Sequence, residues 1–566
     1  MKKAITTFAV LALIAIPLFG GVVMAVEKDK EQIEELEARI QKLEMQNAKD
    51  RIQFTGDLRT TADNISATLA PRVDGLKLQK GMVDTLFYAG ANMGAFPMSY
   101  GDVSNFIAAN YADYLYFQNG LNFDWLKNQV NGIASQPGGD MMIAGLFGML
   151  MDPAAGVPGI MVPEQDYKND LVYTTRLRLN MNAKVKENVT FTGRLGMYKS
   201  WGDSTGVQVF NGQTNTFSLD GSDVGVPNSD ILRVERAYFD WKHLGGSDWY
   251  LSIGRRPSTY GPPLQVSDNE LRQGTPNGHV VNFQFDGITL GRAVGWSPGS
   301  TFRFCYGVGF EAGIGSGAEL KAPADRMDDV ILGGINWDIY HTDDMFIQTT
   351  ILGAWDVTDG FNGTLVLPTD PVSGNPINAP VVLRYTPSAH VGDIYLADFL
   401  VERNEGPFTW FASLGLMTSE PDPEVTTPFG GLFSDPLLDT PESRDAWSAF
   451  AGIRFNASDS DMLGLEFNHG SKYWFNFTQA ADDLVGSKLA TRGDVIEAYW
   501  LHEFKEGFGR ARLKFRLGAM HYSYNYTGSG WQLGAPKKID DLMPVISAFP
   551  TYGDALDIRA AITAKF

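Results

Sequence analysis

The sequence predicts an all-β protein: a closed antiparallel transmembrane β-barrel of about sixteen strands, with a short coiled-coil helix before it and a long, partly helical first extracellular loop. Three observations predict this fold. Apolar and polar residues alternate after residue 51, short and long connections follow each other in turn, and the last segment ends on the aromatic Phe566. Because only helices and closed barrels satisfy their own backbone hydrogen bonds in lipid, such strands are expected to close into a ring.

Residues 1–25 are organised as a secretory signal peptide. Two lysines follow Met1, an apolar run extends from about Ala4 to Phe19, and small residues lead to a cleavage site after Ala25. The chain is therefore expected to leave the cytoplasm. The longest later apolar stretch, Met141 to Met151, is about half of the roughly 20 residues that a membrane-spanning helix needs.

Residues 26–50 predict a periplasmic coiled-coil segment. Apolar residues and one asparagine fall at alternating spacings of three and four, with charged residues between them: Ile33, Leu36, Ile40, Leu43 and Asn47. A solvated charged spacer helix is the alternative interpretation, because so short a heptad pattern is marginal by itself. Isoleucine and leucine at these positions favour a two-stranded coil, whereas porin-like barrels are usually trimers.

The barrel is expected to occupy residues 51–566, and both ends of this region have the strand pattern. In the first strand, Ile52, Phe54, Gly56 and Leu58 form an apolar row opposite Gln53, Thr55, Asp57 and Arg59. In the last strand, Leu556, Ile558, Ala560, Ile562, Ala564 and Phe566 form the apolar row. Such an ending resembles the signal by which barrel assembly machinery recognises outer-membrane strands. A soluble sheet with one wet face is the alternative source of this alternation.

The connections between alternating segments predict which strand ends share a side. Seven short ones are expected, at residues 186–188, 244–248, 297–300, 341–344, 402–407, 457–461 and 505–509. Eight longer ones are expected, at about 62–170, 201–230, 256–279, 311–328, 358–392, 418–445, 469–494 and 523–553. This alternation gives sixteen strands with both termini on the side of the short turns. Aromatic residues near those turns predict an interfacial girdle: Trp241, Trp249, Trp296, Trp337, Trp410, Phe408 and Phe504.

The long first loop, residues 62–170, is more apolar than an exposed loop should be. Its apolar stretches are Met82 to Tyr88, Tyr111 to Phe117 and Met141 to Met151. We expect some helix here, and we expect the loop to fold over or into the barrel interior as a plug, because a long apolar segment is unfavourable in solvent.

Composition excludes several function classes. A formal net charge of -20 disfavours nucleic-acid binding. The single Cys305 cannot form an internal disulfide, and the seven histidines show no metal-ligand spacing. The phosphate-loop, nucleophile-elbow and zinc-protease motifs are absent. Asp459-Ser460-Asp461 fits a polar turn better than a calcium site. The sequence therefore predicts no catalytic residues, no cofactor and no metal site.

The remaining candidate site is the charged inner wall of the barrel. Arg510, Arg512, Lys514 and Arg516 alternate along one strand and predict a basic ladder that attracts anions. Facing carboxylates such as Glu497, Glu503, Asp557 and Glu466 offer the alternative of a neutralised wall. The other pore-lining candidates are Arg176, Arg178, Arg255 and Arg256. By resemblance to general porins, in which the third loop folds inward, Asp268 and Glu270 are expected to oppose the basic wall across a constriction.

Several segments together resemble a porin-like outer-membrane family of unknown function that is common in anaerobic metal- and sulfur-reducing bacteria. They are residues 51–59, 232–238, 253–257 and 470–475, read as RIQFTGDLR, LRVERAY, IGRRP and GSKYWF, after the coiled-coil lead. The resemblance covers nearly the whole mature chain. It implies an outer-membrane barrel but no site residue.

The predicted function is passive diffusion of small hydrophilic solutes or ions through an outer-membrane porin-like channel, and not enzymatic catalysis. A structural or adhesive protein with an occluded pore is one alternative. The barrel component of an extracellular electron-transfer complex is another, and an outer-membrane hydrolase is disfavoured by the missing catalytic motifs. The expected partners are outer-membrane lipid and lipopolysaccharide, the barrel assembly machinery, and further copies of the chain in a homo-oligomer, with a trimer favoured.

Overall fold

The computed structural model describes residues 39, 52–118, 121, 123–202, 227, 230–313, 327–359, 362–363, 383–384, 389–423, 431–435, 440–478, 482–505, 511–530, 532–541, 545–547 and 551–566. The predicted signal segment, nearly all of the predicted coiled coil, and the candidate Arg510 lie outside the described residues. None of the described helices is long and apolar enough to cross a membrane.

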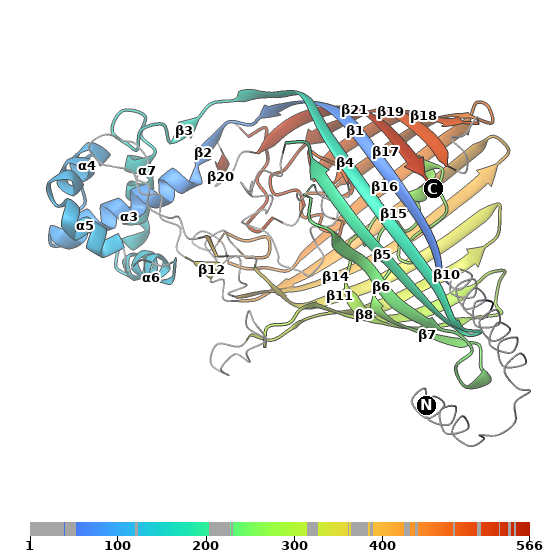
Figure 1. Cartoon of the computed structure of the whole chain (residues 1–566). Helices are drawn as coiled ribbons and strands as arrows, with labels where there is room; N and C mark the ends of the chain where they lie inside the picture. Colours follow the sequence, from blue (N-terminus) through green and yellow to red (C-terminus); the bar gives the residue numbers. More distant parts are fainter. Residues whose placement is uncertain are drawn as a thin grey trace, which may run out of the picture.

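Sixteen described strands form one closed barrel, as the sequence predicts (Figure 1). They are β1 (Ile52–Leu69), β4 (Gln165–Lys186), β5 (Val189–Ser200), β6 (Arg233–Trp241), β7 (Trp249–Arg255), β8 (Asp286–Ala293), β9 (Thr301–Phe310), β10 (Val330–His341), β11 (Met345–Thr358), β14 (His390–Glu405), β15 (Phe408–Pro421), β16 (Arg444–Asn456), β17 (Asp461–Gly470), β18 (Gly493–Phe504), β19 (Arg512–Tyr524) and β21 (Tyr552–Lys565). Each pairs antiparallel with the next in this series, and β21 pairs with β1.

The ring closes between its first and last strands. Asp57 of β1 pairs with Lys565 of β21, and the register continues to Thr68 opposite Asp554. Beyond the last paired residue, Gly56 and Phe566 exchange two backbone hydrogen bonds of 2.8 and 3.0 Å. The Phe566 ring covers Gly56, where an added Cβ would lie 2.6 Å from the ring. Because Gly56 has no side chain, the ring of Phe566 can lie against the outer surface at this position.

The two faces of the strands differ as the alternation predicts. Apolar side chains such as Phe54, Leu517 and Ile562 are exposed on the outside of the ring. Their neighbours on the same strands point inward, and Arg178 and Asp557 are almost completely buried there. An exposed apolar band around a closed ring is the surface that hydrocarbon accepts and water disfavours.

The short connections lie where the sequence predicts them. Six of the seven predicted turns separate consecutive described strands at one end of the barrel, and one contains η1 (Leu244–Gly246). Most of the seventh, between β18 and β19, lies outside the described residues. Trp241, Trp296, Phe408 and Phe504 are exposed beside these turns, consistent with the expected aromatic girdle.

The first long connection is shorter than predicted. β1 continues to Leu69 and β4 begins at Gln165, so the connection spans residues 70–164 instead of 62–170. Asp63 lies within the range predicted for the loop, but it is part of β1 and points into the barrel, where Arg559 binds it. The alternation of inward and outward residues therefore continues beyond residue 62.

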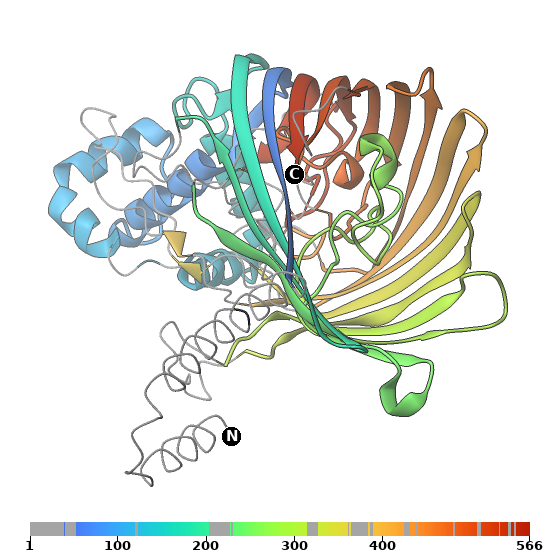
Figure 2. The same cartoon turned by 45° about the vertical axis from the view of Figure 1, so that its right-hand side comes forward.

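This connection contains a small helical unit. Its elements are β2 (Arg72–Asp74), α3 (Gly75–Ala91), α4 (Tyr100–Ala109), α5 (Tyr111–Gln118), α6 (Phe123–Ala134), α7 (Gly139–Leu150) and β3 (Met161–Val162). The strand β2 pairs with β3 and with β20 (Val545–Ser547). The helices have an apolar core of their own, with Leu78, Met82 and Leu150 at its centre. They lie beyond the strand ends in Figures 1 and 2 and do not enter the ring, whereas the plug hypothesis expected them over or inside the barrel interior.

A buried carboxylate holds three of these helices together. Asp84 of α3 accepts hydrogen bonds of 2.5 Å from Lys80 and from Tyr100 of α4, and a further one from Tyr114 of α5. Asp84 has no exposed surface. Burial, followed by the charge of Asp84, raises the pKa values of Tyr100 and Tyr114. Both phenols therefore remain protonated donors.

Replacing Asp84 by alanine is expected to destabilise the helical unit by about 3 kcal/mol, because the buried Lys80 ammonium loses its charged partner. The barrel should remain folded, since its strands pair independently of α3. Thermal unfolding followed by the helical circular dichroism signal measures the loss. Asp113→Ala, at an exposed position of α5, is the control and should change the unfolding free energy by less than about 0.5 kcal/mol. Equal effects of the two substitutions would contradict the central role of Asp84.

Candidate functional site

Two long connections enter the ring and meet inside it. One joins β7 to β8 (residues 256–285) and contains α8 (Gln265–Asp268). The other joins β17 to β18 (residues 471–492, described at 471–478 and 482–492) and contains η3 (Lys488–Ala490). The former is the green segment that runs within the barrel in Figure 2. Val281 and Phe477 form a parallel bridge between them. Phe477 also accepts a bond of 2.7 Å from the Asn282 N–H and donates one of 2.8 Å to Val280.

One side of the barrel interior is filled by apolar side chains from these loops. Phe283, Trp474 and Phe475 pack with inward residues of β10, β14 and β15, among them Leu332, Ile394 and Met417. The Trp474 indole has no exposed surface and donates a hydrogen bond of 2.8 Å to the Leu489 carbonyl. The loops are therefore packed against the wall like a protein core and close this part of the lumen.

His279 lies in the same packed region and is a structural residue. Its Nδ1 is 3.0 Å from the hydroxyl of Ser413 and its Nε2 is 2.8 Å from that of Ser448. Burial lowers the pKa of His279 to about 3, so the ring is neutral at physiological pH. Two hydroxyl groups can satisfy a neutral imidazole, because each acts as donor or acceptor as needed.

A charged chamber of about 140 Å³ lies between the two loops and the opposite wall. One water molecule needs on the order of 10–15 Å³ of such space, so the chamber has room for several. Its charged lining comprises eight cations and seven carboxylates: Arg59, Arg176, Arg178, Lys488, Lys514, Arg516, Arg559 and Lys565, with Asp57, Asp268, Glu270, Asp482, Asp483, Glu497 and Asp557. The wall residues come from β1, β4, β18, β19 and β21.

Asp482 connects the β17–β18 loop to the wall. Its Oδ2 accepts from Arg59 of β1 at 3.2 Å, and also from Arg176 of β4 and from the Tyr260 hydroxyl. Burial alone raises the pKa of this carboxyl, but the guanidinium groups of Arg176 and Arg59 lower it well below its usual value. Asp482 is therefore ionised and joins two strands to both inward loops.

Arg178 extends this network toward β6. Its Nε donates to Glu235 at 2.9 Å, and its guanidinium lies over the Tyr260 ring at 4.5 Å from the centroid. The predicted pore-lining residues Arg176 and Arg178 thus do face the interior, but each binds a carboxylate. Neither presents an unopposed positive charge to the chamber.

The basic row on β19 meets the acids of the β7–β8 loop. Lys514 binds Glu270 and lies 2.9 Å from Glu503, while Arg516 lies 2.8 Å from Asp268 and 2.5 Å from Glu497. The sequence offered an anion-attracting ladder or a neutralised wall, and these contacts match the neutralised wall. The loop acids do not face the ladder across an open gap; they bind it directly.

The remaining arginine candidates that the structure describes, Arg512, Arg255 and Arg256, lie in three different places. Arg512 begins β19 on the inward side and is exposed near the short turns, while Arg510 lies outside the described residues. Arg256 points inward, with its guanidinium 5.2 Å from the centre of the Tyr238 ring. Arg255 was expected to line the pore, and this expectation is wrong: it binds the exposed Asp286 at 2.9 Å on the outer face. Alternation along the strand end places the two neighbours on opposite faces.

Sequence reasoning missed the contribution of residues 471–492. Lys488 from this loop lies 2.5 Å from Glu466 of β17 and 2.5 Å from Glu497 of β18, and Asp482 joins β1 to β4. A signal was present in the sequence: four aromatic residues fall between Tyr473 and Phe477, inside a long connection. An exposed loop seldom carries such a run, and the same reasoning that was applied to the first loop would have indicated inward packing here.

Chemically, the chamber combines carboxylates with guanidinium and ammonium groups in direct contact. Such pairs can exchange partners with water, with ions and with polar solutes, since each charged group forms several hydrogen bonds. The arrangement can contact both cations and anions, and it does not favour ions of one charge.

Comparisons with known proteins identify a family and a set of distant structures. A family model described as "Protein of unknown function (DUF3373)" matches residues 166–566. No curated protein sequence matches the chain. Among solved structures, the loop L8 deletion mutant of OmpT, an outer membrane protein of Vibrio cholerae, is 9% identical over 91% of this chain and 99% of that chain, with a TM-score of 0.37.

Two further structures are similar to the same degree. OprB of Pseudomonas putida at high pH is 9% identical over 92% of this chain and 96% of that chain, with a TM-score of 0.39. The outer membrane channel DcaP of Acinetobacter baumannii is 8% identical over 90% of this chain and 96% of that chain, with a TM-score of 0.34. The fold assignment rests on the hydrogen-bonded pairing of the strands themselves.

Proposed function

Since this chain belongs to the family described as a protein of unknown function, DUF3373, we propose its function from the geometry of its own interior: it is an outer-membrane channel for ions and small hydrophilic solutes. The charged chamber inside a closed ring supports this proposal. Taking ions out of water costs several kcal/mol each even when they are paired, so an interior with many ionised groups is favoured by aqueous contents. The apolar outer face supplies the surface for lipid.

The passage we propose is narrow and off-centre. The packed apolar loops occupy one side of the lumen, which leaves the charged wall of β1, β4, β19 and β21 as the hydrophilic route. A purified full-length chain in planar bilayers is expected to conduct in small discrete steps, with a reversal potential in a salt gradient that shows little ion preference. Large, strongly anion-selective steps would contradict a neutralised wall.

A structural protein with an occluded pore is the second candidate. The observation that favours it is the apolar cluster of loop and wall side chains across the lumen, with Trp474 and Phe475 at its centre. The same bilayer experiment separates the two functions, because complete absence of conductance in a correctly folded protein would support occlusion and exclude the channel.

The assembly and location follow as further proposals. We propose that the C-terminal strand, which ends on Phe566, is recognised by the barrel assembly machinery, and that lipid and lipopolysaccharide surround the apolar face. We also propose a homo-oligomer, with a trimer favoured, a signal peptide at residues 1–25 and a coiled coil at residues 26–50. Chemical cross-linking of the protein in native membranes tests the oligomer.

Asp483 makes the proposed channel sensitive to pH. Burial raises the pKa of Asp483 to about 7, although Lys488 and Arg559 lower it. As the pH rises from 6 to 8 this carboxyl gains a negative charge, and the reversal potential is expected to shift toward cation preference. The same ionisation removes stability as the pH rises through about 7, because the protonated form is the one that the fold favours.

Asp483→Asn is the matched variant for this prediction. Asparagine keeps an oxygen for the bond of 3.0 Å from the Lys488 N–H but cannot ionise. Its ion preference should therefore lack the change near pH 7 and remain at the wild-type value measured near pH 6. If the variant and the wild type shift equally, Asp483 is not the titrating group.

A further inference from the structure

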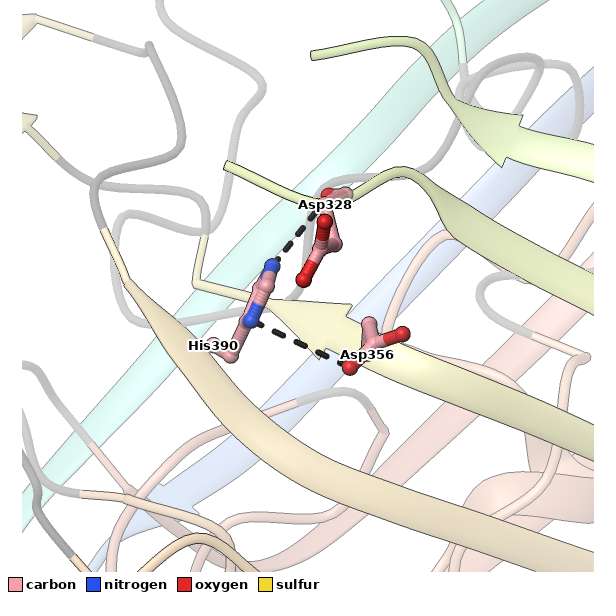
Figure 3. Close-up of side chains that lie close together, drawn as sticks. All are labelled: Asp328, Asp356 and His390. Carbon is pink, nitrogen blue, oxygen red and sulfur yellow. Dashed lines mark hydrogen bonds and ion pairs between the residues drawn. The ribbon is translucent and has the colours of Figure 1, made fainter. Parts of the chain in front are cut away.

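Three side chains that are distant in sequence converge at the rim of the barrel on the side of the long loops. Asp328 precedes β10, Asp356 lies near the end of β11, and His390 begins β14 (Figure 3). One potential metal-ligand atom from each residue lies within 4.8 Å of those of the other two. Strand pairing brings the ends of these strands together, since β11 pairs with both β10 and β14.

The histidine is oriented by a backbone carbonyl. Its Nε2 is 3.2 Å from the Asp328 carbonyl oxygen, which can only accept, so the Nε2 position carries the hydrogen. In the neutral ring Nδ1 then has the lone pair, and this atom points toward Asp356 (Figure 3). A ring N–H bound to a backbone carbonyl, with the other nitrogen directed at carboxylates, is the usual arrangement of a metal-bound histidine.

The spacing fits two ligands of one ion better than a hydrogen bond. The Nδ1 of His390 and the Oδ1 of Asp356 are 3.9 Å apart, beyond hydrogen-bond distance. Two ligand atoms that each lie about 2.1 Å from a tetrahedral zinc ion are roughly 3.4 Å apart. A side-chain movement of about half an ångström would therefore bring both atoms to one ion.

Neighbouring carboxylates strengthen the attraction for a cation. Asp393 accepts the Asp356 N–H at 2.9 Å and so supports the residue that carries one ligand. Asp422 is also nearby. Burial raises the pKa of its carboxyl, and so do the negative charges of Asp393 and Asp356, whereas His390 lowers it. Four aspartates around one histidine give this part of the rim a negative field.

We propose that Asp328, Asp356 and His390 bind one divalent transition-metal cation, with Zn²⁺ as its test probe. One imidazole and two carboxylates form a mixed nitrogen and oxygen set that suits zinc and related ions. The Asp356 side chain is 47% exposed, which leaves room for water or an external ligand at the remaining coordination positions. The ion ties together the loop-side ends of β10, β11 and β14.

Two other histidines of this chain each contact one aspartate at hydrogen-bond distance and serve as a comparison. His469 lies 2.8 Å from Asp494, and His502 lies 2.8 Å from Asp461. Each makes a direct contact with one carboxylate at hydrogen-bond distance, whereas His390 faces its carboxylate from a longer distance with a second one close by. His469 is therefore a suitable control, since its removal changes the histidine count but leaves the proposed site intact.

The test is a calorimetric titration of the metal-free, full-length protein in detergent with Zn²⁺. The wild type is expected to bind one Zn²⁺ per chain, His390→Ala and Asp356→Asn to lose at least tenfold in affinity each, and His469→Ala to bind like the wild type. Heat-modifiable electrophoretic migration checks that each variant is folded. The proposal is overturned if the wild type shows no saturable binding of Zn²⁺, or if His390→Ala and Asp356→Asn bind Zn²⁺ as tightly as the wild type.

A spectroscopic measurement on the wild type does not depend on any variant. Co²⁺ substituted for Zn²⁺ is expected to show visible absorption of a site with nitrogen and oxygen ligands, and added Zn²⁺ should displace it. A spectrum identical to that of aqueous Co²⁺ overturns the proposal. Because conductance is not the readout, failure here leaves the proposed channel function untouched.

Discussion

Replacing Asp482 by asparagine is expected to lower the free energy of unfolding by about 3 kcal/mol, because it leaves the cations of Arg59 and Arg176 without their shared carboxylate. The Asp482 side chain is only 8% exposed, and removing one partner of a buried ion pair costs about 3–5 kcal/mol. Urea unfolding in detergent, followed by tryptophan fluorescence, measures this loss. Trp474 of the same loop, which is fully buried, contributes to that signal.

The pH dependence of the loss has a defined sign. The pKa of Asp482 is lowered in the folded chain, so its contribution to stability is present above the ordinary value of 3.8 and disappears as the pH falls through and below it. The wild type and Asp482→Asn should therefore differ at neutral pH and converge in acid. A constant difference across this range would mean that the charge of Asp482 is not responsible.

The matched control is an exposed ion pair at the short turns. Asp459 lies 3.2 Å from Lys505, and its side chain is 90% exposed. Asp459→Asn should reduce stability by less than about 1 kcal/mol, because water screens such a pair. Equal losses in the two variants would show that Asp482 has no special role in holding the loop.

Shortening the β17–β18 loop is expected to raise single-channel conductance several-fold. Replacing residues 473–489 by a short glycine and serine linker removes Trp474, Phe475 and Phe477, which pack against the inner wall. Because conductance grows with the free cross-section, removing one of the two loops that fill the lumen should widen the aqueous route. Recordings in planar bilayers at fixed salt concentration measure the change.

Deleting the helical unit is the control for the loop deletion. Removal of residues 76–150 should leave conductance unchanged, since these helices lie beyond the strand ends (Figure 1). If deleting the helices raised the conductance strongly and shortening the β17–β18 loop did not change it, the first connection would be the segment that closes the lumen. Heat-modifiable migration confirms that both shortened chains form barrels.

Most of the barrel could be predicted from the sequence because its physics is local. The inward Arg176 and Arg178 and the outward Leu177 and Leu179 follow from the period of two, which any strand with lipid on one side must show. The short turns could also be predicted, because a tight connection between two antiparallel strands leaves only a few polar residues between two segments of alternating apolar and polar residues. These features need no knowledge of distant contacts.

The contents of the barrel could not be predicted in the same way. Lys514 and Glu270 are 244 residues apart, and Val281 meets Phe477 across a comparable separation. Such contacts have no periodic pattern, because irregular loops pack by shape and charge. The acids Asp268 and Glu270 were placed by resemblance to general porins, whereas Asp482 and the rim histidine His390 had no comparable guide.

The seam between β1 and β21 has a consequence for the order of assembly. Residues 57–68 pair with positions 554–565, about five hundred residues further along the chain, so the ring cannot close before the last strand is in place. Until then the growing sheet has two unsatisfied edges, each a template for mispairing with another chain. A polypeptide that stops before Tyr552 should therefore behave as an open, sticky sheet, however well its other hairpins have formed.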